Sequence, residues 1–299
     1  MNESSGPFVG IVTVLYASEA VLPGFMASLA KQTDTRFRVY FIDNSPSDTG
    51  LQLARSLAAN AGIDAVFKFG HGNVGIARGN NLGIELALAD GCSHILLANN
   101  DVEFGAATLA GLLQALNVSG APAVTPKFYY HGTDRMLWYA GGSINRWTMR
   151  VIHNGMHRKD VGQFDHITSA QFAPACFALL RADVFSAIGN FDEKYFVYYE
   201  DTDFAWRMNR HGMNFVFTPR IVVSHKVSAL TGGPLSVFTL YYTNRNRIYF
   251  IRKNLRGFNK LCALTYVLAG RIPTLLRLEP AKSKRAWRGV FDGLTMRVV

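Results

Sequence analysis

The first hundred residues alternate between short apolar runs and longer stretches with helical spacing. The runs are rich in Val, Ile, Phe and Leu, which is typical of buried strands. The predicted strands are Phe8–Tyr16, Phe37–Ile42, Ala65–Phe69 and Ser93–Ala98, and the predicted helices are Glu19–Lys31, Gly50–Ala61 and Gly75–Ala89. Regular alternation of strand and helix predicts an α/β fold with a mostly parallel sheet and helices on both faces.

Turn-rich segments follow three of these strands directly. They are Ala17-Ser18, Asp43-Asn44 and Asn99-Asn100-Asp101. Because ligands bind beyond the C-terminal ends of parallel strands, we expect the three turns to face one crevice. Asp101 is a candidate ligand for Mg²⁺ or Mn²⁺, since Mg²⁺ takes one or two protein carboxylates and completes its shell with phosphate oxygens and water. The alternative is an Asn/Asp turn that caps the strand end.

The periodicity weakens after residue 120, where we predict helices at Ala182–Ile188, Asp201–His211 and Tyr241–Lys253. Three acids in four residues, Glu200-Asp201-Thr202-Asp203, follow the aromatic segment Phe191–Tyr199. Acids framed by aromatic rings suit a sugar pocket in which one carboxylate is the general base. The alternative is that these acids only complement the dipole at a helix start.

Gly70-His71-Gly72-Asn73-Val74-Gly75 fits the G-x-G-x-x-G dinucleotide fingerprint. That fingerprint belongs after the first strand of a doubly wound unit, whereas here two strand–helix units precede it. A thin turn beside Arg78 is instead suited to a phosphate group, or to tight packing of a helix start. We therefore do not predict a nicotinamide enzyme.

Charge divides the chain of 299 residues into two unequal parts. Residues 1–244 carry 18 Lys and Arg against 19 Asp and Glu, a net charge of −1. Residues 245–299 carry 13 against 2, a net charge of +11, which gives the +10 of the whole chain. A basic arm on a neutral body predicts contact with anionic lipid, phosphate or nucleic acid.

Cysteine usage and hydropathy predict the compartment. The three cysteines form no C-x-x-C pair and are odd in number, which is typical of free thiols in a reducing compartment. Met1–Pro7 does not resemble a signal peptide, and no uninterrupted apolar stretch reaches ~18 residues. We expect a soluble or peripheral cytoplasmic protein.

Taken in order, these motifs resemble the family-2 glycosyltransferases of the GT-A fold, and within them the rhamnosyltransferase-like bacterial branch. The resemblance spans about Val9–Asn254. The motifs are a strand leading to Tyr-Ala-Ser, Ile-Asp-Asn-Ser-Pro-Ser-Asp, Asn-Val-Gly-x-Ala-x-Gly-Asn-Asn-x-Gly, Leu-Leu-x-Asn-Asn-Asp, Glu-Asp-x-Asp-Phe-x-x-Arg, a later histidine and Tyr-Tyr-x-x-Arg-Asn. It implies a catalytic domain at residues 1–244 and a basic, partly apolar helical extension at 245–299.

The resemblance also implies roles by position. Asp201 is the catalytic base, and Asp101 and His225 hold the divalent cation. The residues expected at the nucleotide-sugar donor are Thr13, Tyr16, Asp43, Asn73, Arg78, Asn100 and Arg245. The acceptor side is expected to include Tyr198, Glu200 and Asp203. An ordinary aspartate is already ionised at pH 7, so the base needs little tuning of its pKa.

Two positions depart from the family pattern. Asn99-Asn100-Asp101 offers one carboxylate where a D-x-D element offers two, which affects the expected metal affinity. Ala173-Pro174-Ala175-Cys176 stands where relatives usually have a glycine, which alters the expected acceptor pocket.

The implied reaction is an inverting transfer of L-rhamnose from dTDP-rhamnose to a hydroxyl of a growing cell-surface glycan, expected to be lipid-linked, at the inner face of the cell membrane. Nucleic acid is not an expected partner. Three alternatives remain open. One is a transferase of the same fold that uses a UDP-linked galactose, glucose or N-acetylglucosamine, because fold does not fix the donor. Another is a nucleotidyltransferase, although Val14–Ser18 lacks the expected glycine- and lysine-rich phosphate loop. The third is a non-catalytic sugar or nucleic-acid binder.

Overall fold

The computed structural model describes residues 8–227, 233 and 235–298, and for residues 271 and 274–276 it describes the backbone alone. Met1–Pro7 therefore lies outside the described residues. The strands are β1 (Val9–Leu15), β2 (Phe37–Asp43), β3 (Ala65–Lys68), β4 (His94–Ala98), β5 (Val102–Phe104), β6 (Ala123–Tyr130), β7 (Leu137–Tyr139), β8 (Gly142–Ile144), β9 (Val151–His153), β10 (Thr168–Ala170), β11 (Phe177–Arg181) and β12 (Phe215–His225). The helices are α1 (Leu22–Ala30), α2 (Thr49–Ala61), α3 (Gly75–Ala89), α4 (Thr108–Ser119), α5 (Ala182–Ile188), the 3₁₀ turn η1 (Glu193–Tyr195), α6 (Glu200–Arg210), α7 (Val237–Asn254), α8 (Gly257–Leu276) and α9 (Pro280–Thr295).

One large sheet organises the molecule, in the order β10-β12-β6-β11-β4-β1-β2-β3. Its N-terminal half, β4-β1-β2-β3, is parallel throughout, as the alternation of strand and helix predicted. In the other half, β11 runs antiparallel to both β4 and β6, and β12 pairs parallel with β6. Because β11 is antiparallel to both of its neighbours, β6 runs in the same direction as β4, and so does β12. Strand β12 therefore ends at the same edge of the sheet as β1, β2 and β4.

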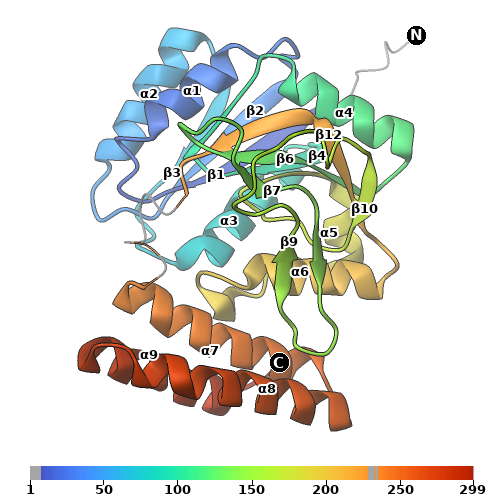
Figure 1. Cartoon of the computed structure of the whole chain (residues 1–299). Helices are drawn as coiled ribbons and strands as arrows, with labels where there is room; N and C mark the ends of the chain where they lie inside the picture. Colours follow the sequence, from blue (N-terminus) through green and yellow to red (C-terminus); the bar gives the residue numbers. More distant parts are fainter. Residues whose placement is uncertain (1–7, 228–232, 234, 299) are drawn as a thin grey trace.

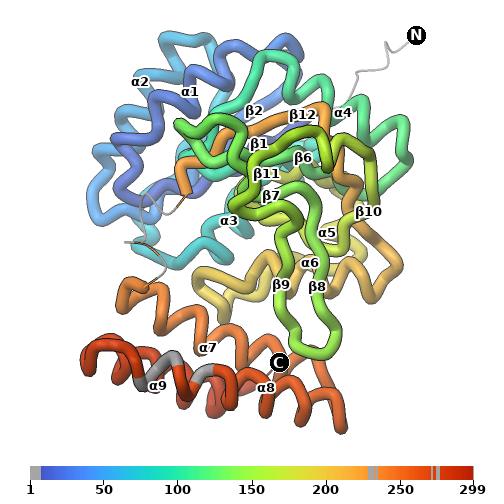
Figure 2. The backbone as a smooth tube through the Cα atoms, viewed as in Figure 1, coloured from blue at the N-terminus to red at the C-terminus, as the bar shows by residue number. Residues whose placement is uncertain are grey.

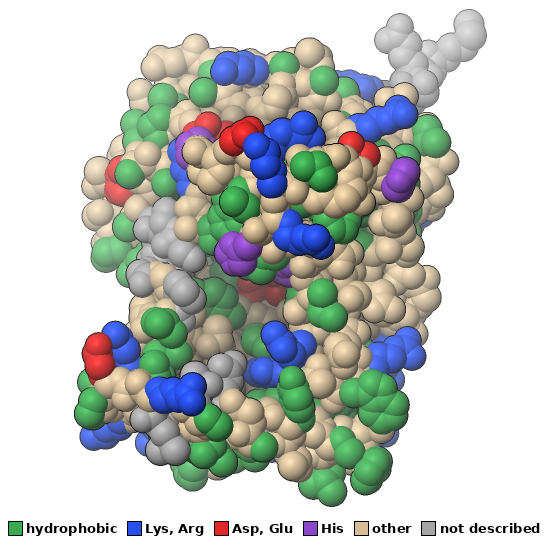
Figure 3. All heavy atoms as spheres, in the orientation of Figure 1, with side chains coloured by type: hydrophobic (Ala, Val, Ile, Leu, Met, Phe, Trp, Pro, Cys, Tyr) green, Lys and Arg blue, Asp and Glu red, His purple; other side chains and the backbone are tan. Residues whose placement is uncertain are grey.

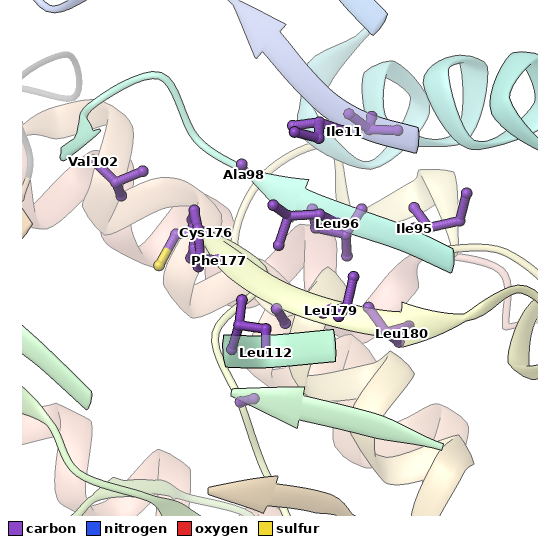
Figure 4. Close-up of a cluster of buried hydrophobic side chains, with 14 of the residues drawn as sticks. Ile11, Ile95, Leu96, Ala98, Val102, Leu112, Cys176, Phe177, Leu179 and Leu180 are labelled. Carbon is purple, nitrogen blue, oxygen red and sulfur yellow. The ribbon is translucent and has the colours of Figure 1, made fainter. Parts of the chain in front are cut away.

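The core lies on both faces of this sheet. Helices α1, α2 and α4 lie on one face, and α3, α5 and α6 lie on the other (Figure 1). Side chains from the central strands and α4 interdigitate between them, among them Ile11, Leu96, Leu112 and Leu179 (Figure 4). Each fully buried side chain of this kind contributes ~1.5–3 kcal/mol to the stability of the fold. This packing fixes the strand ends on which the site is built.

The three C-terminal helices form a further layer beyond α6 (Figure 1). Helix α7 buries Ile248, Tyr249, Phe250 and Ile251 in a second core that includes Tyr195 of the body. A Cβ at Gly289 or Gly293 of α9 would collide with the backbone carbonyl of Tyr241 or Arg245 in α7. Backbone therefore packs on backbone where α9 crosses α7.

The predicted basic extension at 245–299 comprises the second half of α7 together with α8 and α9, and residue 245 lies inside α7. Among the described residues, no helix has the length and apolar character needed to cross a membrane. The short β8–β9 hairpin projects toward this layer (Figure 2).

Candidate active site

Most of the predicted site residues lie at or near the edge where β1, β2, β4 and β12 end. Buried polar groups in folded proteins nearly always have a hydrogen-bond partner. Within the described part of the chain, the following buried side-chain atoms in and beside the predicted site have none: Thr13 Oγ1, Asp43 Oδ2, His71 Nδ1, Asp101 Oδ1, Glu200 Oε2 and His225 Nδ1. Their concentration here indicates a site built for a polar ligand.

The nucleotide end of the site is formed by β1 and β2. Thr13 is fully buried in β1, and Asp43 lies at the end of β2 opposite Leu15. The Asp43 carboxylate accepts a hydrogen bond from the Ser45 backbone N–H at 2.8 Å through one oxygen. Its other oxygen has no partner among the described residues. Tyr16, with 43% of its surface exposed, lies at the rim.

The Gly70–Gly75 turn closes this end. Asn44 contacts His71 at 2.9 Å and donates a hydrogen bond to the Gly75 carbonyl at 3.0 Å. Burial lowers the pKa of His71, so its imidazole is neutral at pH 7. Neither Asn44 nor His71 was assigned a role from the sequence, although both stand in the motifs that flagged this region.

The Gly70–Gly75 turn matches the alternative in which it packs tightly at the start of a helix. Gly75 has φ 81°, and a Cβ there would lie 2.5 Å from the Phe196 carbonyl oxygen. The exposed residue Asn73 accepts a hydrogen bond from the Gly75 N–H at 3.0 Å. Arg78 is half-buried in the first turn of α3 and forms an ion pair with Glu193 at 2.8 Å. Only one of its five N–H donors is used in that bond, which leaves others for a phosphate group.

Asp101 and His225 are brought together by the sheet. The His225 Nε2 lies 3.3 Å from the Asp101 Oδ1, but that oxygen has no hydrogen bond with correct geometry among the described residues. The His225 ring packs edge-on against Trp138, with centroids 4.5 Å apart, which fixes its orientation. A carboxylate and an imidazole that face one another without a hydrogen bond fit a divalent cation.

The turn around Asp101 is held by its neighbours. The Asn100 side chain is buried and donates a hydrogen bond to the Val14 carbonyl at 2.7 Å, which ties the turn to β1. No group of three His, Cys, Asp or Glu residues suited to a metal occurs in the described ranges. Most of the cation's shell would therefore come from the donor diphosphate and water, as is usual for Mg²⁺.

Asp201 lies in the first turn of α6, where its carboxylate accepts hydrogen bonds from the Thr202 backbone N–H at 2.7 Å and the Thr202 hydroxyl at 3.2 Å. Asp201 retains some exposed surface, but an apolar cavity of about 10 Å³ lined by Ala173, Ala175 and Phe204 adjoins it. Burial raises the pKa of Asp201 to about 6, although the hydrogen bonds oppose this. The expectation of an aspartate with an ordinary pKa was therefore wrong, because tertiary packing removes water from the carboxyl group.

The pKa of Glu200, the residue before Asp201, is also raised. Burial, followed by the charge of Asp201, raises the pKa of Glu200 well above its ordinary value. Of the two adjacent carboxyl groups, Glu200 is therefore the one that burial and repulsion hinder more from ionising. Asp201 is the group on which a negative charge forms more readily, which makes it the better candidate for the proton acceptor.

Cys176 lies near both the turn at Asn99-Asn100-Asp101 and the proposed base, Asp201. Burial raises the pKa of its thiol well above the ordinary value, and the charges of Asp101 and Asp201 raise it further. Its carbonyl accepts a hydrogen bond from the Asn99 N–H at 2.8 Å. Both carboxylates therefore lie close enough to Cys176 to affect its thiol. The sequence marked this position as a departure from the family but did not indicate that it lies near both groups.

Two predicted residues lie in other surroundings. The Asp203 carboxylate is fully buried and pairs with Arg207 at 2.9 Å and with Lys253 at 3.0 Å. With no exposed surface it cannot reach an acceptor, so it holds α6 against α7 instead. The Arg245 guanidinium donates hydrogen bonds to the backbone carbonyls of Lys194 and Tyr195, both at 2.7 Å. These roles depend on which way each side chain faces, and spacing along the chain does not determine that.

A larger cavity adjoins His225 on the side of β6 and β12. Its volume is about 850 Å³, and its lining includes Tyr130, Met136, His157 and Lys226. The Tyr130 and His157 rings are stacked with centroids 5.2 Å apart. This half of the sheet lies away from the β1–β2 nucleotide end. Figure 3 shows a hollow between the sheet body and the C-terminal helices, with histidine and acidic side chains gathered around it.

Tyr198 lies between the site and α7, and its hydroxyl is 3.2 Å from the Thr239 hydroxyl. Of the three residues expected on the acceptor side, Asp203 forms ion pairs inside the fold, which leaves Tyr198 and Glu200 as candidates to contact the acceptor.

The family model described as "Glycosyl transferase family 2" matches residues 10–189. The chain is 25% identical over 246 residues to an N-acetylglucosaminyl-diphospho-decaprenol L-rhamnosyltransferase from Mycobacterium tuberculosis. The aligned region covers 74% of this chain and 77% of that protein. The chain is 24% identical over 222 residues to the dTDP-rhamnosyl transferase RfbF from Shigella flexneri, which covers 71% of each. The matched family region ends before Asp201, so the geometry and the motif carry that residue's assignment.

Solved structures share the fold at low sequence identity. GalNAc-T7 with UDP, GalNAc and Mn²⁺ has a TM-score of 0.66 and 14% identity, over 96% of this chain and 55% of that chain. The Pyrobaculum calidifontis mannosyltransferase PcManGT with GDP-Man and Mn²⁺ has a TM-score of 0.62 and 12% identity, over 98% and 88%. S. aureus TarS has a TM-score of 0.61 and 14% identity, and this chain spans about half of its length, 48%. The GT-A fold that the resemblance implied is thereby confirmed.

Proposed function

Because this chain belongs to glycosyl transferase family 2, we propose that it transfers an L-rhamnosyl group from dTDP-rhamnose to a hydroxyl of a lipid-linked bacterial glycan. That it is a glycosyltransferase follows from the family. The sugar and the acceptor class are supported by the two rhamnosyltransferases to which it is similar, one of them named for a diphospho-decaprenol-linked acceptor.

The observation that carries the proposed chemistry is that the Asp201 carboxylate and the Asp101–His225 pair both lie near the buried Cys176. In an inverting displacement, the acceptor oxygen forms a bond to the anomeric carbon on the face opposite the nucleotide. The bond from that carbon to the diphosphate oxygen breaks, and its electron pair leaves with the nucleoside diphosphate. The acceptor's proton passes to Asp201, whose pKa of about 6 makes it a stronger base than an ordinary aspartate.

Asp101 and His225 are the residues that would hold Mg²⁺ or Mn²⁺ here. Bound between them and the donor, the cation would neutralise charge that develops on the leaving diphosphate. Thr13, Tyr16 and Asp43 are proposed to hold the nucleoside, with Asn73 and Arg78 near the diphosphate. Asn100 acts through the β1 backbone, since its amide donates a hydrogen bond to the Val14 carbonyl. The acceptor is proposed to lie against Glu200 and Tyr198 and to extend toward the cavity beside His225.

The C-terminal helices are proposed to dock the enzyme on the inner face of the cell membrane. The inner faces of α8 and α9 are buried through Ala263, Val267 and Val290. Their outer faces carry large exposed apolar side chains, Phe258, Leu261, Tyr266 and Ile272 on α8 and Trp287, Phe291 and Leu294 on α9. Basic residues lie among them, and residues 245–299 have a net charge of +11. Figure 3 shows hydrophobic and basic side chains interspersed over this layer. Anionic headgroups attract such charges by ~1 kcal/mol for each Lys or Arg near the surface.

Turnover with a panel of donors tests the proposed sugar. dTDP-rhamnose should be used faster than UDP-galactose, UDP-glucose or UDP-N-acetylglucosamine, each assayed with a diphosphate-linked GlcNAc acceptor and Mg²⁺ or Mn²⁺. A clear preference for a UDP-sugar would replace the donor assignment while retaining the enzyme class. Release of pyrophosphate from a nucleoside triphosphate and a sugar phosphate would instead indicate a nucleotidyltransferase.

A further inference from the structure

The segment that leads into the catalytic helix has an unusual backbone. Phe196, Tyr198 and Tyr199 have φ values of 64°, 65° and 74°, in the left-handed region that L-residues other than glycine seldom adopt. Tyr199 directly precedes α6, whose second residue is Asp201. The direction in which α6 begins therefore depends on a conformation that the segment would not adopt by itself.

Asn246 of α7 holds this segment on one side. Its side chain is fully buried, and its amide nitrogen lies within hydrogen-bond distance of three backbone carbonyls of the segment. These are the carbonyls of Tyr195 at 2.9 Å, Val197 at 2.7 Å and Tyr198 at 2.7 Å. Three carbonyls can converge on one amide because the left-handed residues turn the chain around it.

Arg245 orients that amide. Its Nε donates a hydrogen bond to the Asn246 Oδ1 at 2.7 Å, which directs the amide NH₂ group toward the carbonyls. Its Nη2 donates to the carbonyls of Lys194 and Tyr195, and its guanidinium lies over the Tyr242 ring, 4.7 Å from the centroid. Neighbouring residues of α7 thus act together on the same segment.

The start of α3 holds the opposite side. The Ile76 N–H donates to the Phe196 carbonyl at 2.6 Å, so every carbonyl from residue 194 to 198 accepts a hydrogen bond from outside the segment. Glu193, just before it, accepts hydrogen bonds from Arg78 and Asn81 of α3. The segment therefore lies between the start of α3 and α7.

We propose that Asn246, oriented by Arg245, is a positioning residue that sets the placement and the desolvation of Asp201 by holding the segment in which Phe196, Tyr198 and Tyr199 have positive φ. The inference rests on the proposed role of Asp201 as the base. Losing the amide would let the segment relax, tilt the first turn of α6 and admit water to the carboxyl group. Both the rate of proton transfer and the pKa of the base would fall, while donor binding on β1 and β2 would be unchanged.

Asn244 offers a matched control. It is also a buried asparagine of α7, but its amide nitrogen donates to the Leu240 carbonyl within the same helix and not to residues 194–199. Asn244→Ala therefore reports the general cost of removing a buried amide from α7. Asn246→Ala should reduce kcat by at least ~10-fold more than Asn244→Ala, since misplacement of a reacting group by about 1 Å costs up to ~100-fold. The KM for the donor should stay within ~3-fold of wild type.

The pH dependence separates positioning from stability. In Asn246→Ala, the pH at which kcat falls on the acid side should be lower than in wild type and closer to the pKa of a solvated aspartate. In Asn244→Ala, this pH should be unchanged. If Asn246→Ala does not fold, Arg245→Lys serves instead, since lysine keeps the charge but cannot bond the amide and both carbonyls as the guanidinium does. It should shift kcat and the pH at which kcat falls in the same direction by a smaller amount.

The Asp201→Asn variant shows whether a negative result bears on the assignment of the base or only on the role of Asn246. If that variant turns over like wild type, the base assignment is overturned together with this inference. If it is inactive while Asn246→Ala and Arg245→Lys match Asn244→Ala in kcat and in the pH at which kcat falls on the acid side, this inference alone is overturned.

Discussion

Asp201→Asn should make the protein more stable at alkaline pH while removing its activity. The Asp201 pKa is about 6 in the folded protein, against a reference value of 3.8. The folded state therefore binds this proton more tightly than the unfolded chain does, and ionisation above pH 6 costs free energy of folding. Asparagine has nearly the same shape, keeps an oxygen for the Thr202 hydrogen bonds and never ionises.

The magnitude follows from the two pKa values. At ~1.4 kcal/mol per pH unit, their separation corresponds to at most ~3 kcal/mol of destabilisation of the wild type at pH 7 and above. With an unfolding entropy of ~2.1 cal/mol/K per residue over this chain, that is ~5 °C in Tm. The cost to wild type decreases as the pH falls through 6 and vanishes below about 3.8, where the carboxyl group is protonated in both states.

Thermal unfolding of both proteins at about pH 8, 6 and 4.5, with turnover at pH 8, gives the test. The Tm of Asp201→Asn should exceed that of wild type at pH 8, and the gap should narrow toward pH 4.5, while kcat falls by ~100-fold or more. Asp203→Asn is the control, because breaking its buried pairs with Arg207 and Lys253 should destabilise the protein by ~3–5 kcal/mol. A Tm difference that does not vary with pH, or a less stable Asp201→Asn at pH 8, would refute the desolvation argument.

Three further outcomes are expected. Asp101→Ala and His225→Ala should each weaken dTDP binding measured by calorimetry and abolish its enhancement by Mn²⁺; full activity in excess chelator would show that Arg and His side chains neutralise the diphosphate alone. In wild type, kcat should rise with pH through about 6 because Asp201 must be ionised to accept a proton, and a profile that is flat between about pH 5 and 7 would contradict that role. The protein should co-sediment with anionic but not neutral liposomes at low salt and be released at high salt, and Phe291→Ala with Leu261→Ala should weaken this binding; wild-type protein that ignores anionic liposomes at low salt would exclude electrostatic docking.

Local pattern in the chain was enough to predict the N-terminal half of the fold. Strand periodicity and helix spacing placed β1 to β4 and α1 to α3 within a few residues, because each depends on neighbours along the chain. The same reasoning predicted that polar residues at the strand ends share one edge, since parallel strands all end on the same side. It also predicted free cysteines, and Cys92, Cys176 and Cys262 are free.

Tertiary structure alone decided how the site is assembled and charged. The antiparallel pairing of β12 with β5, in which His225 lies opposite Val102, brings His225 beside Asp101, and no local pattern specifies that contact. The directions of the Asp203 and Arg245 side chains depend on the docking of α7, which spacing along α6 or α7 does not encode. The pKa of Asp201 depends on how completely Ala173, Ala175 and Phe204 exclude water from it. Secondary structure follows from interactions between near neighbours, whereas desolvation and long-range pairing arise only when distant segments pack together.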